Sequence, residues 1–320
     1  MRATGTDTDA IFLSAVSYLK GKSTPISDLT DGNLSSGAIT MLAEQGIHQY
    51  YKRKSTAEEM YAATIARTTK AAGLKVDDLR GISFAQPTVE WDQSEEASLM
   101  TALESVGFKA GPVVGTSLQG CSALAGAIMG ASQLIQLSGG PILLLLGGIK
   151  GPNGVRYSPE LSAIFSDGVA SAIISRGSGD FRILAISTRT SIRLATNLTA
   201  GSRNLSHTCE LVSETISKAM SAAGIAPDDV NMLSSNNTSK IALEFLSAAS
   251  GIPAQRIWPF DVGHLGHFYS CDTLINLDQA HQSGRLAVGD IVVLAGWSPY
   301  TVSAVVMRMD KGPQSQRPGI

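Results

Sequence analysis

Aromatic residues and cysteines are scarce in this chain of 320 residues. Phe, Trp and Tyr make up 6% of it, whereas glycine occurs 32 times. So few large side chains and so many small ones favour an α/β protein with closely packed elements over an all-β sandwich. The three cysteines are odd in number and lack the spacing of a disulfide framework. We therefore expect free thiols and a reducing, cytoplasmic location.

Excess charge and long apolar runs are also missing. The net charge is −2 and the sequence pI is about 6.2, so the composition offers no electrostatic basis for binding nucleic acid or an anionic membrane. The longest apolar run, PILLLLGGI, is far shorter than the ~20 residues that span a bilayer. The first residues, MRATGTDTDAIFLSAV, contain two aspartates before a short apolar run, which makes a poor signal peptide. We expect no membrane segment.

An internal duplication is present instead. The segment TTKAAGLKVDDLRGISFAQP predicts a helix, a turn and a strand, and AMSAAGIAPDDVNMLSSNN repeats this pattern. Gly73 and Gly224, which end the two helices, lie 151 positions apart. A second pair of segments matches at Gly140 and Gly289, 149 positions apart. A period this long is not that of a solenoid and indicates two similar α/β halves.

Cys121 has the most distinctive surroundings of the three cysteines. The segment VVGTSLQGCSALAGAIMGASQLIQ predicts a strand, a short turn after Gly120 and a helix that begins at or near Cys121. A helix N-terminus stabilises a thiolate through its dipole and free N–H groups. The N–H of Cys121 can also point at the oxygen of a bound thioester. A nucleophile and a buried structural cysteine are both compatible with this pattern.

Several motifs, in order along the whole chain, resemble one family. LQGCSALAGAIMGASQLIQLSG is similar to the helix that carries the family's nucleophilic cysteine, and FSDGVASAII is similar to its FGDGAGAAV motif. The tail GDIVVLAGWSPYTVSAVVMRM is similar to its closing strands. The chain thus resembles the thiolase superfamily and, within it, β-ketoacyl-acyl-carrier-protein synthase III. The resemblance implies a homodimer with a thiolase-like, duplicated five-layer αβαβα fold, divided here into residues 1–175, which carry the cysteine, and 176–320.

The sequence departs from this family at two catalytic positions. Family members use Cys, His and Asn, but the aligned position of the histidine is Ser235, or Asn236 with a slip of one residue. His267, in GHLGHFYSCD, falls on the asparagine position. An imidazole beside a nucleophile is a general base, and Asp272 can hold its second nitrogen if a turn follows His267. Cys121, His267 and Asp272 then resemble a subgroup that transfers acyl groups to oxygen or nitrogen in natural-product pathways.

The resemblance implies a two-stage reaction without a cofactor. Cys121 takes an acyl group from an acyl-carrier-protein or coenzyme A thioester, and His267 then deprotonates a small-molecule acceptor with a hydroxyl, amine or thiol group. The N–H groups of Cys121 and Ser298 are expected to form the oxyanion hole. The substrate pocket is expected to include four residues, namely Ser235, Asn236, Trp297 and Pro299.

Other functions remain open from the sequence alone. The protein could be a decarboxylative condensing enzyme in which His267 alone does the work that the family divides between a histidine and an asparagine. The chain could also be a non-catalytic subunit of a paired synthase, although the complete Cys, His and Asp set argues against that.

A metal site is a further alternative for the GHLGHFYSCD segment. Its ligands would be His264, His267, Cys271 and Asp272. Gly263 and Gly266 favour a loop over the helix that would place both imidazoles on one face, and the sequence has no second cluster to complete four ligands. We therefore predict no metal.

Overall fold

A single nine-stranded mixed sheet organises the chain. The computed structural model describes residues 9–30, 34–86, 93–109, 111–150, 154–159, 163–196, 202–259 and 265–313. In spatial order the strands are β11 (Val230–Ser235), β12 (Ile291–Trp297), β13 (Thr301–Met309), β10 (Phe181–Thr190), β1 (Ile11–Lys20), β9 (Gly168–Arg176), β6 (Ile142–Gly148), β4 (Gly81–Ala85) and β5 (Val113–Thr116).

The sheet consists of two similar halves that meet at β1 and β10. In the first half β5, β4 and β6 are parallel, β9 is antiparallel to β6, and β1 is antiparallel to β9. In the second half β11 and β12 are parallel, β13 is antiparallel to β12, and β10 is antiparallel to β13. Within the described part of the sheet, two residue pairs join the halves, Phe12 with Arg182 and Leu13 with Phe181. The strand order is therefore repeated outward from this junction.

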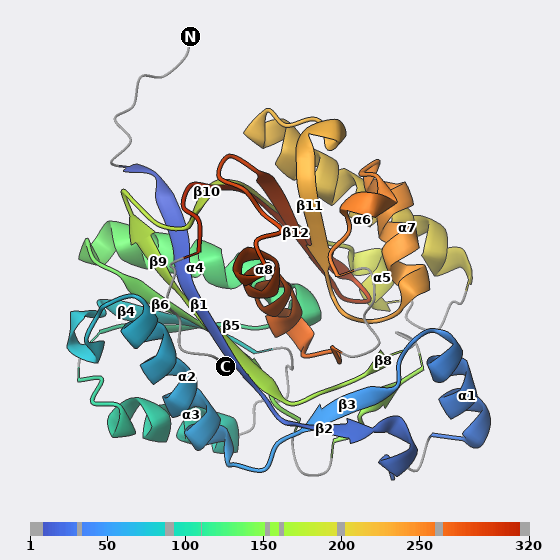
Figure 1. Ribbon diagram of the computed structural model, residues 1–320, viewed down its shortest axis with the longest axis horizontal. Coiled ribbons are helices and arrows are strands. Elements are labelled where there is room, and N and C mark those ends of the chain that lie inside the picture. The colour runs from blue at the N-terminus through green and yellow to red at the C-terminus, as the bar shows by residue number, and fades with distance from the viewer. Residues whose placement is uncertain are drawn as a thin grey trace.

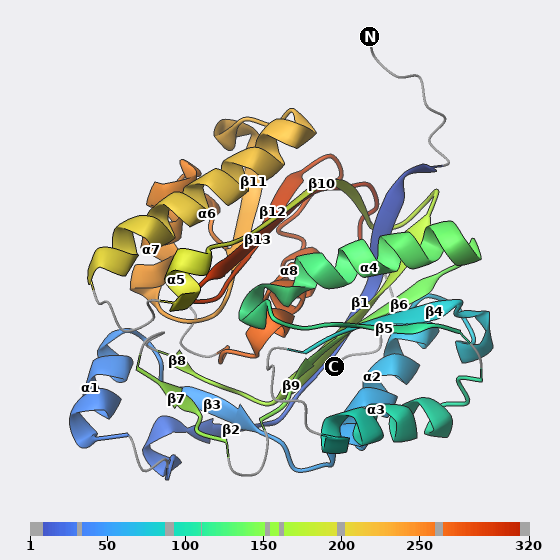
Figure 2. The same cartoon turned by 180° about the vertical axis from the view of Figure 1, so that it is seen from behind.

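Helices cover both halves and fill the space between them. The outer layers are α2 (Ala57–Ala71) with α3 (Gln93–Ser105) on the first half, and α6 (Ser202–Ala223) with α7 (Lys240–Ser250) on the second. The central layer contains α4 (Ala123–Ser138) and α8 (Asp272–Gln282), and α4 contacts strands of both halves. Figures 1 and 2 show this arrangement from opposite sides. The predicted five-layer α/β fold is confirmed.

The composition of α4 suits its central position. Ala125, Ala127, Ile128 and Ala131 are completely buried in it, because small side chains let the helix approach both parts of the sheet. Among the described residues, one helical stretch, Gly120–Ser138, has the length and apolar character to cross a membrane, with a mean hydropathy of 1.2. Slightly more than half of that stretch, 56%, is buried inside the protein. Its position between two layers of strands accounts for its apolar composition.

The predicted repeat has a structural basis. Gly73 and Gly224 both have left-handed backbone angles, with φ of 67° and 69°, directly after α2 and α6. β6 and β12 begin 149 positions apart, at Ile142 and Ile291. In the second half, only one bridge within the described residues, Ile257 with Leu233, corresponds to the pairing of β5 with β4. The boundary predicted at 175/176 falls at the end of β9 and stays a prediction.

A small lobe extends from the first half. Its strands are β2 (Lys22–Pro25), β3 (Gln49–Lys52), β7 (Tyr157–Ser158) and β8 (Ala163–Ile164), and its helix is α1 (Ser36–Glu44). Its own apolar cluster includes Leu42, Ile47 and Tyr50. The remaining elements are α5 (Ile192–Thr196) and the 3-10 turns η2 (Ile26–Asp28), η3 (Val76–Asp78), η4 (Gly120–Ser122), η5 (Pro227–Asp229), η6 (Ala254–Arg256) and η7 (Tyr269–Cys271).

Candidate active site

Cys121 lies in the turn η4, between β5 and α4. Gly120 has a φ of 53°, a left-handed angle that favours glycine, and it turns the chain so that Cys121 enters the interior. The side chain is 6% exposed. The helix α4 begins at Ala123, two residues later than the earliest start that the sequence predicts. Among the described residues, the N–H of Cys121 has no backbone hydrogen-bond partner.

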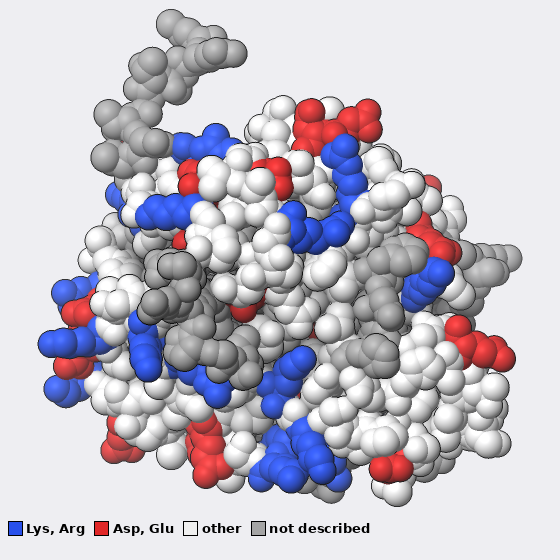
Figure 3. Space-filling view, viewed as in Figure 1, with Lys and Arg blue, Asp and Glu red and all other residues white. Residues whose placement is uncertain are grey.

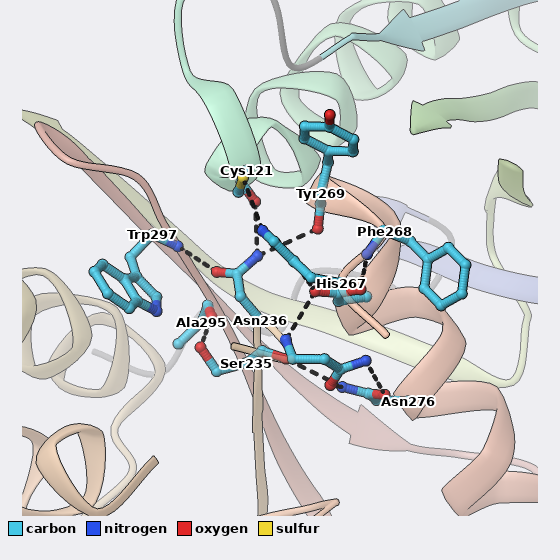
Figure 4. A network of polar contacts seen from close by, with 11 residues as sticks. Cys121, Ser235, Asn236, His267, Phe268, Tyr269, Asn276, Ala295 and Trp297 are labelled. Atoms are coloured by element: carbon cyan, nitrogen blue, oxygen red, sulfur yellow. Dashed lines mark hydrogen bonds and ion pairs between the residues drawn. The ribbon is translucent and has the colours of Figure 1, made fainter. Parts of the chain in front are cut away.

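The three residues predicted to act together form one chain of contacts. The Sγ of Cys121 lies 3.4 Å from Nε2 of His267, and Nδ1 of His267 lies 2.5 Å from Oδ2 of Asp272. Figure 4 shows His267 beside Cys121. His267 and Asp272 are 1% and 0% exposed, so water does not screen these interactions. The arrangement can hold a thiolate, an imidazolium and a carboxylate in series.

Asp272 reaches the imidazole because the turn η7 folds the chain back. Asp272 is the first residue of α8. Besides His267, it accepts hydrogen bonds from the N–H of Phe268 at 2.6 Å and from the N–H of Asn237 at 2.8 Å. Three donors therefore stabilise its charged form without water. The carboxylate fixes both the position and the tautomer of the imidazole.

The surroundings of His267 favour its protonated form. Burial, the largest influence, lowers its pKa, but the charges of Asp272 and Cys121 and the hydrogen bonds to both raise it. The net effect raises the pKa of His267 from 6.5 to about 10. A proton on the imidazole pairs with a thiolate on one side and a carboxylate on the other, which is the charge state that a cysteine nucleophile needs.

Asn236 joins three chain segments around the sulfur. Its Nδ2 donates to the backbone oxygens of Cys121, at 3.3 Å, and Tyr269, at 3.2 Å. Its Oδ1 accepts from the N–H of Trp297 at 2.8 Å. The amide, which is 1% exposed, thus holds the turn of the nucleophile, the loop of the base and the end of β12 together. The sequence placed Asn236 in the substrate pocket and did not predict this clamp.

Ser235, which the sequence places in the substrate pocket, is bonded to the neighbouring strand. It is the last residue of β11, and its Oγ donates to the backbone oxygen of Ala295 on the neighbouring strand at 2.7 Å. Asn276, which the sequence analysis missed, donates from Nδ2 to the oxygen of Ser235 at 3.0 Å and to Oδ1 of Asn237 at 2.9 Å.

The hairpin between β12 and β13 also differs from expectation. The N–H of Ser298 donates to the backbone oxygen of Thr301 at 2.8 Å and is therefore already bonded within the hairpin. It is not free to meet a substrate oxyanion in this arrangement. Trp297 is half-buried, whereas Pro299 is exposed. Of the two predicted oxyanion donors, Cys121 alone keeps an unbonded N–H among the described residues.

A second group of residues supports the loop of His267 from β8. Phe165 pairs with His267, and its ring lies 5.1 Å from the imidazole and stacks on Tyr269 at 4.3 Å. The N–H of Ser166 donates to the oxygen of His267 at 2.7 Å. The buried carboxylate of Asp167 accepts from Arg156 at 2.7 Å. These residues belong to the FSDG motif, which the sequence related to the family without assigning a role.

Two glycines provide the surface on which this loop lies. Gly148 of β6 and Gly168 of β9 are partners in the sheet. A Cβ atom on Gly168 would lie 2.5 Å from the ring of Phe268, and one on Gly148 would lie 2.6 Å from the backbone oxygen of Phe268. Both distances are shorter than van der Waals contact, so the residue that follows His267 packs on bare backbone.

The alternative of a metal centre gains no support. The described residues contain no group of three His, Cys, Asp or Glu side chains arranged to hold a metal ion. His264 lies outside the described residues. Cys271 is buried, with Sγ 3.3 Å from the oxygen of Leu146, and burial raises the pKa of its thiol well above the usual range. Cys271 is therefore a neutral core residue.

Comparisons with known proteins agree with this geometry. Residues 220–309 match the family model described as 3-oxoacyl-(acyl-carrier-protein) synthase III C terminal. Curated protein sequences give no match. Among solved structures, ChlB3, described as an acyltransferase, has a TM-score of 0.79 at 19% identity and covers 95% of this chain and 98% of its own.

Two bacterial synthases have the same fold. The 3-oxoacyl-(acyl-carrier-protein) synthase III of Aquifex aeolicus has a TM-score of 0.74 at 17% identity, with 93% of this chain and 99% of that one covered. The enzyme of the same description from Pseudomonas aeruginosa has a TM-score of 0.76 at 14% identity, with 95% and 100% covered. The chain therefore has the thiolase-like fold of these structures. Residues 220–309 also resemble the C-terminal part of 3-oxoacyl-(acyl-carrier-protein) synthase III in sequence.

Proposed function

We propose that this protein is an acyltransferase that carries an acyl group on Cys121 and passes it to a hydroxyl, amine or thiol acceptor in natural-product biosynthesis. The observation that carries the proposal is the hydrogen-bonded series from Cys121 through His267 to Asp272. A nucleophile, a base and a group that orients the base are the components of acyl transfer through a covalent intermediate.

In the first stage, the thiolate of Cys121 attacks the carbonyl carbon of a donor thioester. A new carbon–sulfur bond forms, and the bond to the donor sulfur breaks. The protonated His267 gives its Nε2 proton to the leaving thiolate, so that a neutral imidazole remains beside the acyl-enzyme. The N–H of Cys121, at the start of the turn that precedes α4, donates to the oxyanion of the tetrahedral intermediate.

In the second stage, the neutral imidazole acts as a base. Nε2 of His267 takes the proton of the acceptor while the acceptor's oxygen, nitrogen or sulfur attacks the acyl carbon. The bond to Sγ breaks, Cys121 returns to the thiolate and His267 to the imidazolium. Asp272 stays ionised throughout and stabilises the positive imidazole at the start and the end of the cycle.

The surroundings of Asn236 support acyl transfer over carbon–carbon condensation. Decarboxylation of an extender needs a second polar donor beside the histidine to stabilise the carbanion. The N–H groups of Asn236 are bonded to the oxygens of Cys121 and Tyr269, and the hydroxyl of Ser235 is bonded to Ala295. Neither side chain at the family's histidine position has a free donor to offer an extender.

The donor in this proposal is an acyl-carrier-protein or coenzyme A thioester, the acceptor is a small molecule, and no cofactor takes part. Acidic and basic side chains alternate over the face in Figure 3, which fits the low net charge. The proposed homodimer has support at the edge strand β5 and the nearby α4, where Val114, Leu118 and Met129 are 37%, 60% and 44% exposed. The free cysteines support a reducing cytoplasm.

Mass spectrometry of the acylated protein tests this proposal. The purified protein is incubated with acyl-carrier protein charged with an acyl group, and with an acyl-N-acetylcysteamine thioester, which needs no protein contact. We expect an adduct of one acyl group on Cys121 and none in Cys121→Ala. Failure to form the adduct with either donor would favour the non-catalytic subunit. Adding a malonyl thioester separates the other alternative, since release of CO2 with a β-keto product would establish a condensing enzyme.

A further inference from the structure

Tyr269 is a buried residue of the site that the proposed reaction does not use. It follows Phe268 in the loop of the base, at the start of η7, and is 4% exposed. Its φ of 57° is rare for a residue with a bulky side chain, and such angles collect at functional sites. The angle turns its backbone oxygen to Asn236 and its ring to Phe165, so both ends of the residue are fixed.

The ring of Tyr269 has a defined orientation beside the sulfur. It stacks on Phe165 with ring centres 4.3 Å apart and planes 4° apart, and its centre lies 5.8 Å from that of the His267 imidazole. Figure 4 shows the side chain extending past Cys121, with the hydroxyl on the side away from the imidazole. The position is thus next to the atom that receives the acyl group.

The hydroxyl of Tyr269 is buried and has no hydrogen-bond partner among the described residues. Buried polar atoms in folded proteins nearly always have a partner, and each exception needs a reason. A phenylalanine would stack on Phe165 equally well without burying an unbonded oxygen. The oxygen is therefore available to a partner that arrives with the acyl group.

The charge state of Tyr269 makes this hydroxyl both a donor and an acceptor. Burial, followed by the charge of Cys121, raises the pKa of the phenol well above its usual range, so that it stays protonated. Among the charges that act on it is that of Glu95, at the start of α3, whose carboxylate accepts from the side chain of Gln86. A neutral phenol thus lies among the aromatic rings of Phe165 and His267 beside Cys121.

We infer that Tyr269 selects acyl groups that carry a hydroxyl or keto oxygen, by a hydrogen bond from its phenol to that oxygen. The inference rests on the proposed acyl transfer through Cys121 and adds the class of acyl group to it. An acyl group with a methyl in place of the oxygen leaves the phenol unbonded and binds less well, because a site built for a hydrogen bond discriminates against the analogue that lacks it.

Matched pairs of thioesters test this inference. The probes are N-acetylcysteamine thioesters of butanoyl groups with a hydroxyl at carbon 2, 3 or 4, each compared with the acyl group that has a methyl at the same carbon. The rate of acylation of Cys121 is measured by mass spectrometry for the wild type and Tyr269→Phe. We expect at least one hydroxyl compound to be preferred by the wild type, and this preference to fall about tenfold in Tyr269→Phe, as the loss of one ordinary hydrogen bond predicts.

Tyr18→Phe is the matched control. The phenol of Tyr18, on β1, is buried as well, but it bonds the side chain of Gln279. We expect Tyr18→Phe to lower the thermal midpoint and to leave the acyl preference unchanged. Tyr269→Phe should keep or raise the midpoint, because no hydrogen bond within the protein is lost, whereas a merely structural tyrosine would lower it.

The outcomes separate this inference from the proposed function. If the wild type forms no acyl-cysteine with any probe, the proposed function fails, and the inference fails with it. If the wild type is acylated but shows no preference within any pair, or if Tyr269→Phe keeps the preference of the wild type, the inference about Tyr269 alone is overturned. An equal loss of preference in Tyr18→Phe would also overturn it, since the effect would not be local.

Discussion

The two halves of the sheet present different chemistry at corresponding places. In the first half, β5 leads through a loop to the central helix α4, and in the second half the bridge residue Ile257 precedes the central helix α8. Cys121 lies just before α4, and Asp272 is the first residue of α8, with His267 five positions earlier. The first turn of α4 contains no acidic residue, whereas α8 begins with a buried carboxylate.

In the proposed reaction, this difference divides the work between the two halves. The start of α4, without a negative side chain, stabilises the negative sulfur and the oxyanion. The carboxylate of Asp272, at the start of α8, keeps the imidazole positive. The two helix starts would thus stabilise charges of opposite sign.

The largest loss of activity is expected when the reactive thiol of the first half is removed. We expect Cys121→Ala to abolish acyl transfer, with a loss of about 10⁴-fold or more, because no other side chain can carry the acyl group. Stopped-flow measurement of thiol release from an acyl thioester gives the rate. Cys209→Ala is the control and should retain the wild-type rate, since Cys209 lies on α6 in an outer layer. Equal losses in both variants would contradict the assignment of Cys121.

The equivalent change in the second half is Asp272→Asn. The imidazole loses its acceptor and its charge partner, and we expect the rate of acyl transfer to fall about 10³-fold. Titration of the histidine by NMR should show a pKa of His267 lower than in the wild type, because the charge of Asp272 is one of its main supports. Unchanged titration in a folded variant would show that Asp272 does not hold the imidazole.

The interaction of His267 with Asp272 and Cys121 makes the free energy of unfolding depend on pH. The folded state raises the pKa of His267 from 6.5 to about 10, so the protonated form is favoured by folding. This contribution is fully present below pH 6.5 and is lost as the pH rises toward 10. Urea denaturation at several pH values should show a decline across this window that is weaker in His267→Gln. A decline of the same size in both proteins would assign it to other groups.

Asn236 connects the two halves, since it forms hydrogen bonds with both the loop of Cys121 and the loop of His267. We expect Asn236→Ala to lower the rate about tenfold and the free energy of unfolding by about 3 kcal/mol, because buried backbone groups lose their partners. Asn231→Ala, on the strand β11 that precedes Asn236, is the control. Its amide oxygen accepts from the N–H of Ile291, so stability should fall slightly without a change in rate.

The smallest expected effect concerns the two ends of the central helix in the first half. Gly120 and Gly139 have φ of 53° and 72°, on either side of α4. Substitution by alanine should cost about 1 kcal/mol of unfolding free energy at each, because a Cβ atom disfavours left-handed angles. Gly120→Ala should also slow acylation, since it rotates the turn that holds Cys121, whereas Gly139→Ala should not. Equal rates in both variants would show that the turn tolerates the change.

The sequence predicted the parts of this structure that depend on local pattern. The repeat was visible because Gly73 and Gly224 end equivalent helices, and the grouping of Cys121, His267 and Asp272 followed from their places in related motifs. The role of Asn236 was not predictable in the same way. Its partners are backbone atoms from segments far apart in the sequence, and no side-chain pattern records where those atoms lie.

Two other differences have similar physical reasons. The N–H of Ser298 is bonded because the register of β12 and β13 brings it opposite Thr301, and a register is set by the pairing of whole strands. His281 has polar neighbours in the sequence, which favour a surface position, yet it is 3% exposed and packs edge-on against Phe181. His281 is buried because α8 lies in the central layer, and its polar neighbours in the sequence do not indicate this position.

Gly148 and Gly168 have a consequence for how this site can evolve. They carry no functional group, yet the distance from the imidazole to the sulfur depends on them, because Phe268 rests on their backbone. A survey of random substitutions would find both positions as intolerant as Cys121, and the reason would be geometric. The distance from the imidazole to the sulfur depends on the absence of Cβ atoms at these two positions. Substitutions that adapt the site to a new acceptor are therefore expected among the aromatic residues around Tyr269 and not beneath the histidine.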